Sequence, residues 1–280
     1  MNYGANIFYQ GEPGCFSEAA ILSHWPQTRA VAMSSFEDVV KALTSRPESI
    51  GLLPIENAYR GPVYDVLDLL TKGSAALGIR AEVVQPVRLA LLARPGTRLE
   101  DITVVRSHPQ ALMQSRGYWA RRGWRAEPTL DTAGSARELA ERKPQEGVAA
   151  IASPLAGNLY GLDILADNIH DHQDNRTRFW LLSQDPLSGH QSPLGLYKTS
   201  IIFDVPNVPG SLVTVLQHFN RYGLNMNKVE SRPRPGAPFA FRFWVDITGE
   251  PERVVKAIRD AGRDTEWLRV LGECYPVLDH

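Results

Sequence analysis

The sequence lacks several features that would point to particular classes of protein. It has two cysteines, Cys15 and Cys274, which lie far apart and match no metal-binding spacing. A disulfide between them is not excluded by the sequence, but reduced thiols in a cytoplasmic protein are the simpler expectation. Acidic and basic residues nearly balance, at 31 Asp and Glu against 30 Lys and Arg. Bulk electrostatics therefore predict neither a nucleic-acid partner nor a membrane partner.

Long apolar runs are also missing. No stretch reaches the roughly 18 apolar residues that cross a bilayer, and Met1–Asn6 has neither the basic start nor the apolar centre of a secretory signal. The sequence shows no internal repeat and no low-complexity run. We therefore expect a cytoplasmic protein, and 280 residues suffice for two or three domains with sizeable cores.

Apolar strands alternate with helices through the first half of the chain. Strands expected at Ile7–Tyr9 and Ser49–Ile55 are separated by helices, the first of which is expected to begin near Phe16. This alternation predicts an α/β fold with a mainly parallel sheet. Ligands bind such sheets just beyond the carboxyl ends of the strands, so Glu56 and Asn57 are candidate site residues.

Two consecutive extended runs, Leu77–Val84 and Val87–Ala93, interrupt the alternation and indicate a crossover between two lobes. A second set of strand–helix units follows, with one helix expected over His108–Arg122. Ser107 and Ser153 each stand just before a first turn that contains proline. Both are therefore expected to cap helices.

The last third of the chain has a different order of elements. The stretch Gln184–Gly195 is rich in linker residues and has no periodic apolar face, so we place the domain boundary there. The elements expected after it follow the order βαββαβ, as in a ferredoxin-like antiparallel sheet. The expected ranges are a first domain over 1–186 (one lobe about 1–84 plus 165–186, the other about 85–164), a linker over 187–197 and a second domain over 198–280.

A polar loop runs directly into Thr177-Arg178-Phe179 and an apolar strand. The guanidinium of Arg178 can bind a carboxylate through two parallel hydrogen bonds, while the Thr177 hydroxyl can donate beside it. The nearby run His170–His172 could suggest a metal, but no third ligand of matching spacing follows it, and we expect none.

The pattern Asn175-x-Thr177-Arg178-Phe179 resembles the signature of the prephenate dehydratase family. The C-terminal part is similar to the ACT regulatory module that usually follows. Further stretches that resemble this family, in the same order, are Gly11-x-x-Gly14-x-Phe16-Ser17-x-x-Ala20, Pro54-Ile55-Glu56-Asn57, Ser107-His108-Pro109-Gln110-Ala111-Leu112, and Gly210-Ser211-Leu212-Val213 with Glu230-Ser231-Arg232-Pro233.

The resemblance implies a two-lobed catalytic domain like a periplasmic binding protein, followed by a ferredoxin-like ACT domain. It implies a carbon–oxygen lyase that removes CO2 and a hydroxyl from prephenate to give phenylpyruvate, without a cofactor because aromatisation drives the reaction. Thr177 would donate either the proton or a hydrogen bond to the leaving hydroxyl, and Arg178 would bind a carboxylate, while His108 is a weaker candidate for a general base. The implied substrate-binding residues are Gly14, Glu56, Asn57, Ser107, Gln110, Thr132, Asn175 and Phe179.

For the C-terminal module the resemblance implies feedback regulation by phenylalanine bound at a protomer interface, and hence a homodimer or homotetramer. Helix N–H groups near Gly210 suit the ligand carboxylate. The implied phenylalanine-binding residues are Asn207, Pro209, Gly210, Ser211, Leu212, Val213, Glu230, Ser231 and Arg232.

The chain departs from the family pattern at three positions. Family members commonly have Thr at Cys15, Ser at Ala58 and a small residue at Pro62. Because Ala58 removes a hydroxyl from the expected site, arogenate, the amino-acid counterpart of prephenate, is an alternative substrate. A non-catalytic sensor of small carboxylates with the same two-lobed fold is an alternative of another class. A fused helical mutase domain is not expected, because a strand begins at Ile7.

Overall fold

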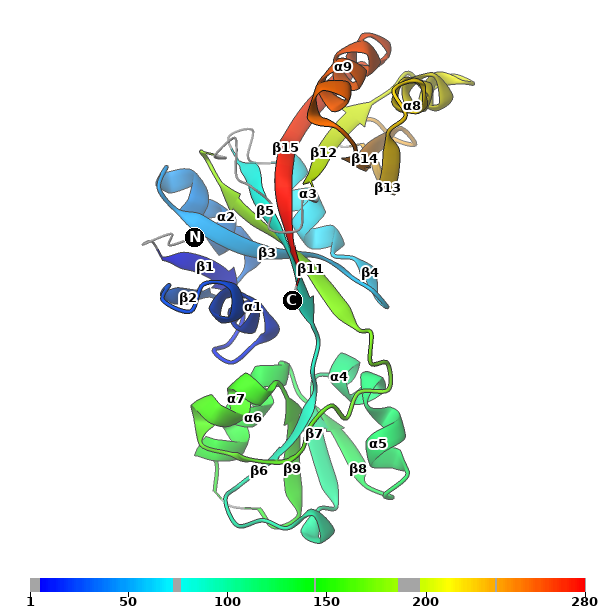
Figure 1. Ribbon diagram of the computed structural model, residues 1–280. Helices are drawn as coiled ribbons and strands as arrows, with labels where there is room; N and C mark the ends of the chain where they lie inside the picture. The colour runs from blue at the N-terminus through cyan, green and yellow to red at the C-terminus, as the bar shows by residue number, and fades with distance from the viewer. Residues whose placement is uncertain (1–5, 73–76, 144, 186–196, 235, 280) are drawn as a thin grey trace. The chain divides into compact units, whose positions relative to one another are not determined.

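The computed structural model describes residues 6–72, 77–143, 145–185, 197–234 and 236–279. These residues form a mixed α/β structure with two sheets (Figure 1), which confirms the expected class. Residues 187–196 of the predicted linker lie outside the described residues. Within the described ranges, no helix is both long and apolar enough to cross a membrane.

The chain forms two compact units. The first contains residues 1–74 and 84–179, and the second contains 75–83 and 180–279. Two of the boundaries between the units fall within strands, β5 (Gly78–Pro86) and β11 (Arg176–Ser183). The second unit therefore includes strand segments that precede the predicted domain boundary.

One part of the first unit is built around the strand β1 (Ile7–Gln10). It pairs in parallel with β2 (Ala30–Met33) and with β3 (Ile50–Asn57), and β4 (Gly61–Pro62) folds back antiparallel onto the end of β3. Most residues of β3 are buried, as expected for a strand covered on both faces. The helices of this part are α1 (Phe16–His24), α2 (Phe36–Ser45) and α3 (Tyr64–Lys72).

The second sheet has the order β10-β6-β9-β7-β8. In it, β7 is parallel to β8 and β9, whereas β6 is antiparallel to β9 and β10. Alternate residues of β9 pack into two different apolar clusters, one on each face. Its elements are β6 (Ala90–Ala93), η1 (Leu99–Asp101), β7 (Val104–Ser107), α4 (Pro109–Gln114), α5 (Arg116–Ala120), β8 (Arg125–Pro128), α6 (Thr132–Glu141), β9 (Val148–Ala152), α7 (Pro154–Tyr160) and β10 (Asp163–Ala166).

The single helix expected over residues 108–122 is wrong: α4 and α5 are separated at Ser115. The Ser115 hydroxyl donates to the carbonyl of Ala111 at 2.7 Å. The amide of Gly117 donates to both carboxylate oxygens of Asp171, each at 3.1 Å. The Gly117 amide therefore bonds to Asp171 in place of a carbonyl of the preceding turn. Because Asp171 is distant in sequence, no local sequence signal predicts this break.

Elements of the second unit follow the order βαββαβ after residue 196, and its strands are ordered β13-β14-β12-β15-β5-β11. The strand β12 pairs antiparallel with both β14 and β15, and β13 pairs antiparallel with β14. Both long helices bury apolar residues in one cluster with the sheet. The elements are β12 (Tyr197–Asp204), α8 (Ser211–Arg221), β13 (Asn225–Pro233), β14 (Phe241–Thr248), α9 (Pro251–Ala261), η2 (Gly262–Asp264) and β15 (Trp267–Asp279).

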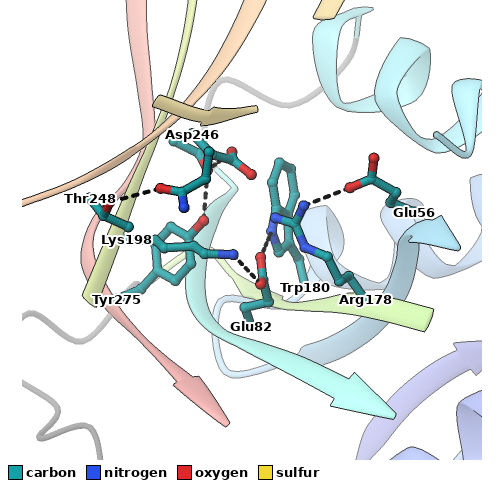
Figure 2. A network of polar contacts seen from close by, with 10 residues as sticks. Glu56, Glu82, Arg178, Trp180, Lys198, Asp246, Thr248 and Tyr275 are labelled. Atoms are coloured by element: carbon teal, nitrogen blue, oxygen red, sulfur yellow. Dashed lines mark hydrogen bonds and ion pairs between the residues drawn. The ribbon is translucent and has the colours of Figure 1, made fainter. Parts of the chain in front are cut away.

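A buried polar network lies in this second unit (Figure 2). The Glu82 carboxylate is fully buried, accepts from Nζ of Lys198 at 2.6 Å, and accepts from the Trp180 indole at 3.3 Å. Ser200 donates to Asp246 at 2.5 Å and lies 2.7 Å from the Tyr275 hydroxyl. Because burial of an unpaired charge is costly, a substitution that removes the Lys198 ammonium alone would leave the Glu82 carboxylate buried without a cation and would strongly lower the stability of the fold.

Candidate active site

The ends of β3 and β11 bring Asn57 and Thr177 together. The Asn57 side-chain amide donates to Thr177 Oγ1 at 3.1 Å, to Asn175 Oδ1 at 2.9 Å and to the Arg176 carbonyl at 3.1 Å. An amide NH2 has two hydrogens, so these three acceptors share them. Asn57 and Asn175 are both buried, which keeps water from replacing these bonds. One side chain of β3 thereby fixes the entry into β11.

The backbone takes over part of the connection at Ala58, where the sequence lacks the usual hydroxyl. The Ala58 amide donates to the Arg176 carbonyl at 2.9 Å. The Asn57 side-chain carbonyl accepts from the amides of Tyr59 and Arg60, each at 3.1 Å. The loop after β3 is therefore held by one backbone hydrogen bond and by the Asn57 side chain, and none of these contacts depends on the side chain at position 58.

A cavity of ≈ 200 Å³ opens beside these residues. Four of the predicted site residues line it: Asn57, Gln110, Thr132 and Thr177. No carboxylate side chain is among the described residues that line the cavity. The site thus combines hydroxyl and amide groups with largely apolar walls, a composition typical of small-molecule sites.

Seven further lining residues were not among the predicted substrate-binding set. The apolar ones come from distant parts of the chain, so no single motif contains them. A signal existed only for His108 and Ala111, which belong to the Ser107–Leu112 motif, and for Phe16, which belongs to the first motif. The seven are Phe16, Val63, Val87, Leu89, His108, Ala111 and Gln114.

His108 has a definite hydrogen-bonding state in this site. Its Nδ1 accepts from the amide of Gln110 at 3.2 Å, and it is the N-cap of α4. With Nδ1 accepting this bond, Nε2 is the ring nitrogen that can donate to a ligand. The expected cap, Ser107, is wrong at this position, because its fully buried hydroxyl instead donates to the Ile151 carbonyl at 2.6 Å.

Arg178 does not line the cavity together with Thr177. Its Nη1 lies 2.6 Å from Oε2 of Glu56 (Figure 2), and both side chains are largely buried. Successive residues of a strand point to opposite faces, so Thr177 and Arg178 face different ways, as do Glu56 and Asn57. The structure therefore pairs the predicted carboxylate-binding residue with a carboxylate of its own chain.

The remaining predicted residues support the site from outside the cavity lining. Gly14 has φ 88°, and a Cβ there would meet the Cα of Ala156 at 2.8 Å, so only glycine fits this close approach. Its carbonyl accepts from Ser153, whose hydroxyl also caps α7 by accepting from the Ala156 amide, as expected for Ser153. Phe179 is 2% exposed and belongs to the core.

Titratable groups near this part of the unit include a cysteine and a histidine. Burial raises the pKa of the Cys15 thiol to about 11, which disfavours the nucleophilic thiolate. Burial also lowers the pKa of His170. Both cysteines are free thiols, and the described residues include no cluster of three or more His, Cys, Asp or Glu that could hold a metal ion.

Only some of the predicted phenylalanine-binding residues line a common cavity in the second unit. Pro209, Gly210 and Ser211 line a cavity of ≈ 400 Å³ at the start of α8, together with Arg263 from η2. Gly210 has φ 90°, a conformation that favours glycine, and it is the N-cap of α8. Asn207, Leu212 and Val213 do not line this cavity, nor do Glu230, Ser231 and Arg232, which lie on β13.

Comparison with known proteins agrees with the motifs. Residues 7–187 match the family model described as prephenate dehydratase. The "Arogenate dehydratase/prephenate dehydratase 2, chloroplastic" of Arabidopsis thaliana is 36% identical over 97% of this chain and 72% of its own length.

Solved structures also resemble this chain over nearly its full length, and two of them are informative. A prephenate dehydratase from Arthrobacter aurescens, solved in complex with L-Phe, has a TM-score of 0.85 and 30% identity, covering 97% of this chain and 89% of its own. A structure described as "GqqA- a novel type of quorum quenching acylases" has a TM-score of 0.86 and 32% identity, covering 97% of this chain and 98% of its own.

These similarities agree with the fold and the cavity, and they show that the protein is a dehydratase, an enzyme of the lyase class. The chain belongs to the prephenate dehydratase family, whose activity serves aromatic amino acid biosynthesis.

Proposed function

We propose that the enzyme converts prephenate to phenylpyruvate, water and CO2 in the cavity beside Thr177. The observation that supports this most directly is the hydrogen bond from Asn57 to Thr177 Oγ1 at 3.1 Å. Because Asn57 occupies a lone pair of this oxygen, the hydroxyl proton of Thr177 points elsewhere and is available to a bound substrate. A threonine hydroxyl is a poor acid, so its fixed position supplies much of the effect.

The chemical step needs one proton and no external electron pair. The bond from the ring to the departing carboxylate breaks, its electrons complete the aromatic ring, and the C4–oxygen bond breaks. The leaving hydroxide takes a proton through Thr177 and departs as water. Donors on Gln110 and His108 are available to the remaining carboxylate, and the apolar lining suits the ring.

In this proposal Arg178 acts through the backbone and its field. Its ion pair with Glu56 at 2.6 Å joins the ends of β11 and β3, the two strands that present Thr177 and Asn57. Arg178 is thus a positioning residue, and the carboxylate-binding role expected for it gives way to this one. Glu56 is its partner and has no direct role with substrate.

We infer that prephenate is preferred over arogenate, and the composition of the cavity lining supports this choice. Arogenate carries an ammonium group, which needs an anionic or strongly accepting partner when it is removed from water. No carboxylate occurs among the described residues that line the cavity, whereas amide, hydroxyl and imidazole groups there suit a carboxylate or a ketone. We therefore assign prephenate as the preferred substrate.

We infer that residues 198–280 form an ACT domain that binds phenylalanine and inhibits turnover, and that residues 1–186 form a two-lobed domain like a periplasmic binding protein. The βαββαβ order and the start of α8 after Gly210 support the regulatory assignment, and a relative of similar structure was solved with L-Phe. An interface site for phenylalanine requires a homodimer or homotetramer, and we place the enzyme in the cytoplasm.

One experiment tests these assignments together. Release of CO2 and formation of phenyl-containing product are measured with prephenate and with arogenate, each with and without phenylalanine. We expect turnover of prephenate to exceed that of arogenate at least tenfold, as one lost hydrogen bond to a charged group is worth about 1.5–3 kcal/mol, and we expect phenylalanine to reduce it. A binding protein without catalysis would release no CO2, and preference for arogenate would reject the substrate assignment.

A further inference from the structure

A second hollow in the first unit is lined by α1, by the segment around Pro86 and by the start of α7. Its volume is ≈ 240 Å³, compared with ≈ 200 Å³ for the candidate active cavity. Phe16, Ala19 and Leu22 are spaced three residues apart on α1 and share one helix face toward it. Leu155 of α7 adds further apolar surface. This groove is therefore large enough for a molecule of the size of the substrate.

Polar groups in the groove are few, and most of them are already bonded. The Ser23 hydroxyl donates to Oε1 of Gln85 at 3.1 Å, and the Ser153 hydroxyl donates to the Gly14 carbonyl at 2.5 Å. Arg88 differs, since it is exposed and has no hydrogen bond or ion pair with any described residue. The groove thus presents apolar walls and one unpaired guanidinium.

We propose that this groove is a second ligand site, separate from the active cavity, and that it binds small aromatic monocarboxylates. The ring packs against Phe16 and Leu155, and the carboxylate pairs with Arg88, the geometry that a guanidinium fork favours. A dianion would place its second carboxylate against the apolar walls of the groove, where burial of a charge is costly. An amino acid would bring its ammonium group toward Arg88. Both classes therefore bind this groove less tightly than a monocarboxylate does.

A ligand bound in the groove is expected to affect the active cavity through Phe16, because this side chain lines both. The groove also joins α1, which belongs to the β1–β3 part, to α7, which belongs to the part with the second sheet. A ligand that contacts both parts stabilises one arrangement of the cavity between them, so it changes the affinity for substrate by linkage. The groove is thus a site of modulation without competition.

The test uses 3-phenylpropionate, which has one carboxylate and a phenyl ring but no leaving group. Its binding to the full-length enzyme is measured by isothermal titration calorimetry for the parent and for Arg88→Gln, Ala19→Phe and Arg121→Gln. Arg121 is an exposed arginine that lies outside the groove lining, so its substitution is the matched control for lost charge. Thermal melting shows that each variant is folded.

We expect Arg88→Gln to weaken binding about tenfold, the low end for a charge-assisted hydrogen bond at an exposed site. Ala19→Phe fills the groove and should abolish binding, whereas Arg121→Gln should bind like the parent. In turnover assays, 3-phenylpropionate should change the KM for prephenate in the parent and not in Ala19→Phe. Equal binding by the parent, Arg88→Gln and Ala19→Phe, strict competition with prephenate, or no binding by the parent at millimolar ligand would each overturn the proposal.

Discussion

The substitution Asn57→Asp tests the role of the hydrogen bonds around Thr177 with almost no change in shape. Asn57 donates its side-chain NH2 to Thr177 Oγ1 at 3.1 Å and to Asn175 Oδ1 at 2.9 Å. An ionised aspartate at this position has acceptors only. The Thr177 hydroxyl would then donate to the introduced carboxylate, and its proton would no longer point toward the substrate.

The size of the effect follows from what is lost. A positioned proton donor contributes typically about 10²–10⁴-fold to rate, so we expect the kcat of Asn57→Asp to fall by about 10²–10³. The buried Asn175 carbonyl oxygen would lose its donor and face a carboxylate. An unsatisfied buried acceptor costs about 1–3 kcal/mol, and we expect the free energy of unfolding to fall by roughly this amount.

Steady-state formation of phenylpyruvate from saturating prephenate measures the kcat, and urea unfolding measures the stability. Asn227→Asp is a matched control, because Asn227 is exposed and its Oδ1 accepts from the Thr248 hydroxyl at 2.7 Å, which an aspartate oxygen can also do. A folded Asn57→Asp enzyme whose kcat stays within about threefold of the parent would refute the reasoning about Thr177.

Further predictions concern groups outside the cavity lining. Glu56→Gln removes the ion pair with Arg178, so we expect kcat to fall about tenfold while the KM for prephenate changes less than about threefold. Arg178→Lys tests the opposite view. If Arg178 bound the substrate carboxylate directly, this substitution would raise KM at least as much as it lowers kcat. Cys15→Ser should retain kcat within about threefold, because burial raises the pKa of this thiol to about 11; a larger loss would indicate a chemical role. Burial lowers the pKa of His170 below its ordinary 6.5, so the fold favours the neutral ring and the unfolded chain binds the proton more readily. The contribution of the neutral His170 to stability is therefore fully present above pH 6.5 and is lost as the pH falls below it. In urea unfolding, the free energy of unfolding of His170→Gln should decrease less between pH 7 and 5 than that of the parent.

The position of Thr177 illustrates how far local sequence reaches. The motif Pro54–Asn57 marks the end of one predicted strand and Asn175–Phe179 marks the start of another, and the structure joins Asn57 to Thr177 directly. The opposite directions of Thr177 and Arg178 also follow from the strand period of two, once β11 is known to begin at Arg176. The sequence motif alone suggested that both residues act side by side, because it does not state which face each one occupies.

Other features had no local signal. The break at Ser115 depends on Asp171, which reaches the amide of Gly117 from a distant loop. The close approach of Gly14 to Ala156 depends on where the turn before α1 meets α7, although the glycine itself was visible in the motif.

The amino-acid order by itself determined the family, the alternation of strands and helices, and the residues at strand ends that bear hydroxyl and amide groups, since these depend on local propensity and on short motifs. Only the tertiary structure decided which of those residues share one cavity, that Arg178 is paired with Glu56, and that Val63, Val87 and Leu89 line the cavity wall. The physical reason is that strand pairing and packing join residues that are far apart in the chain, and a cavity exists only where such distant surfaces meet.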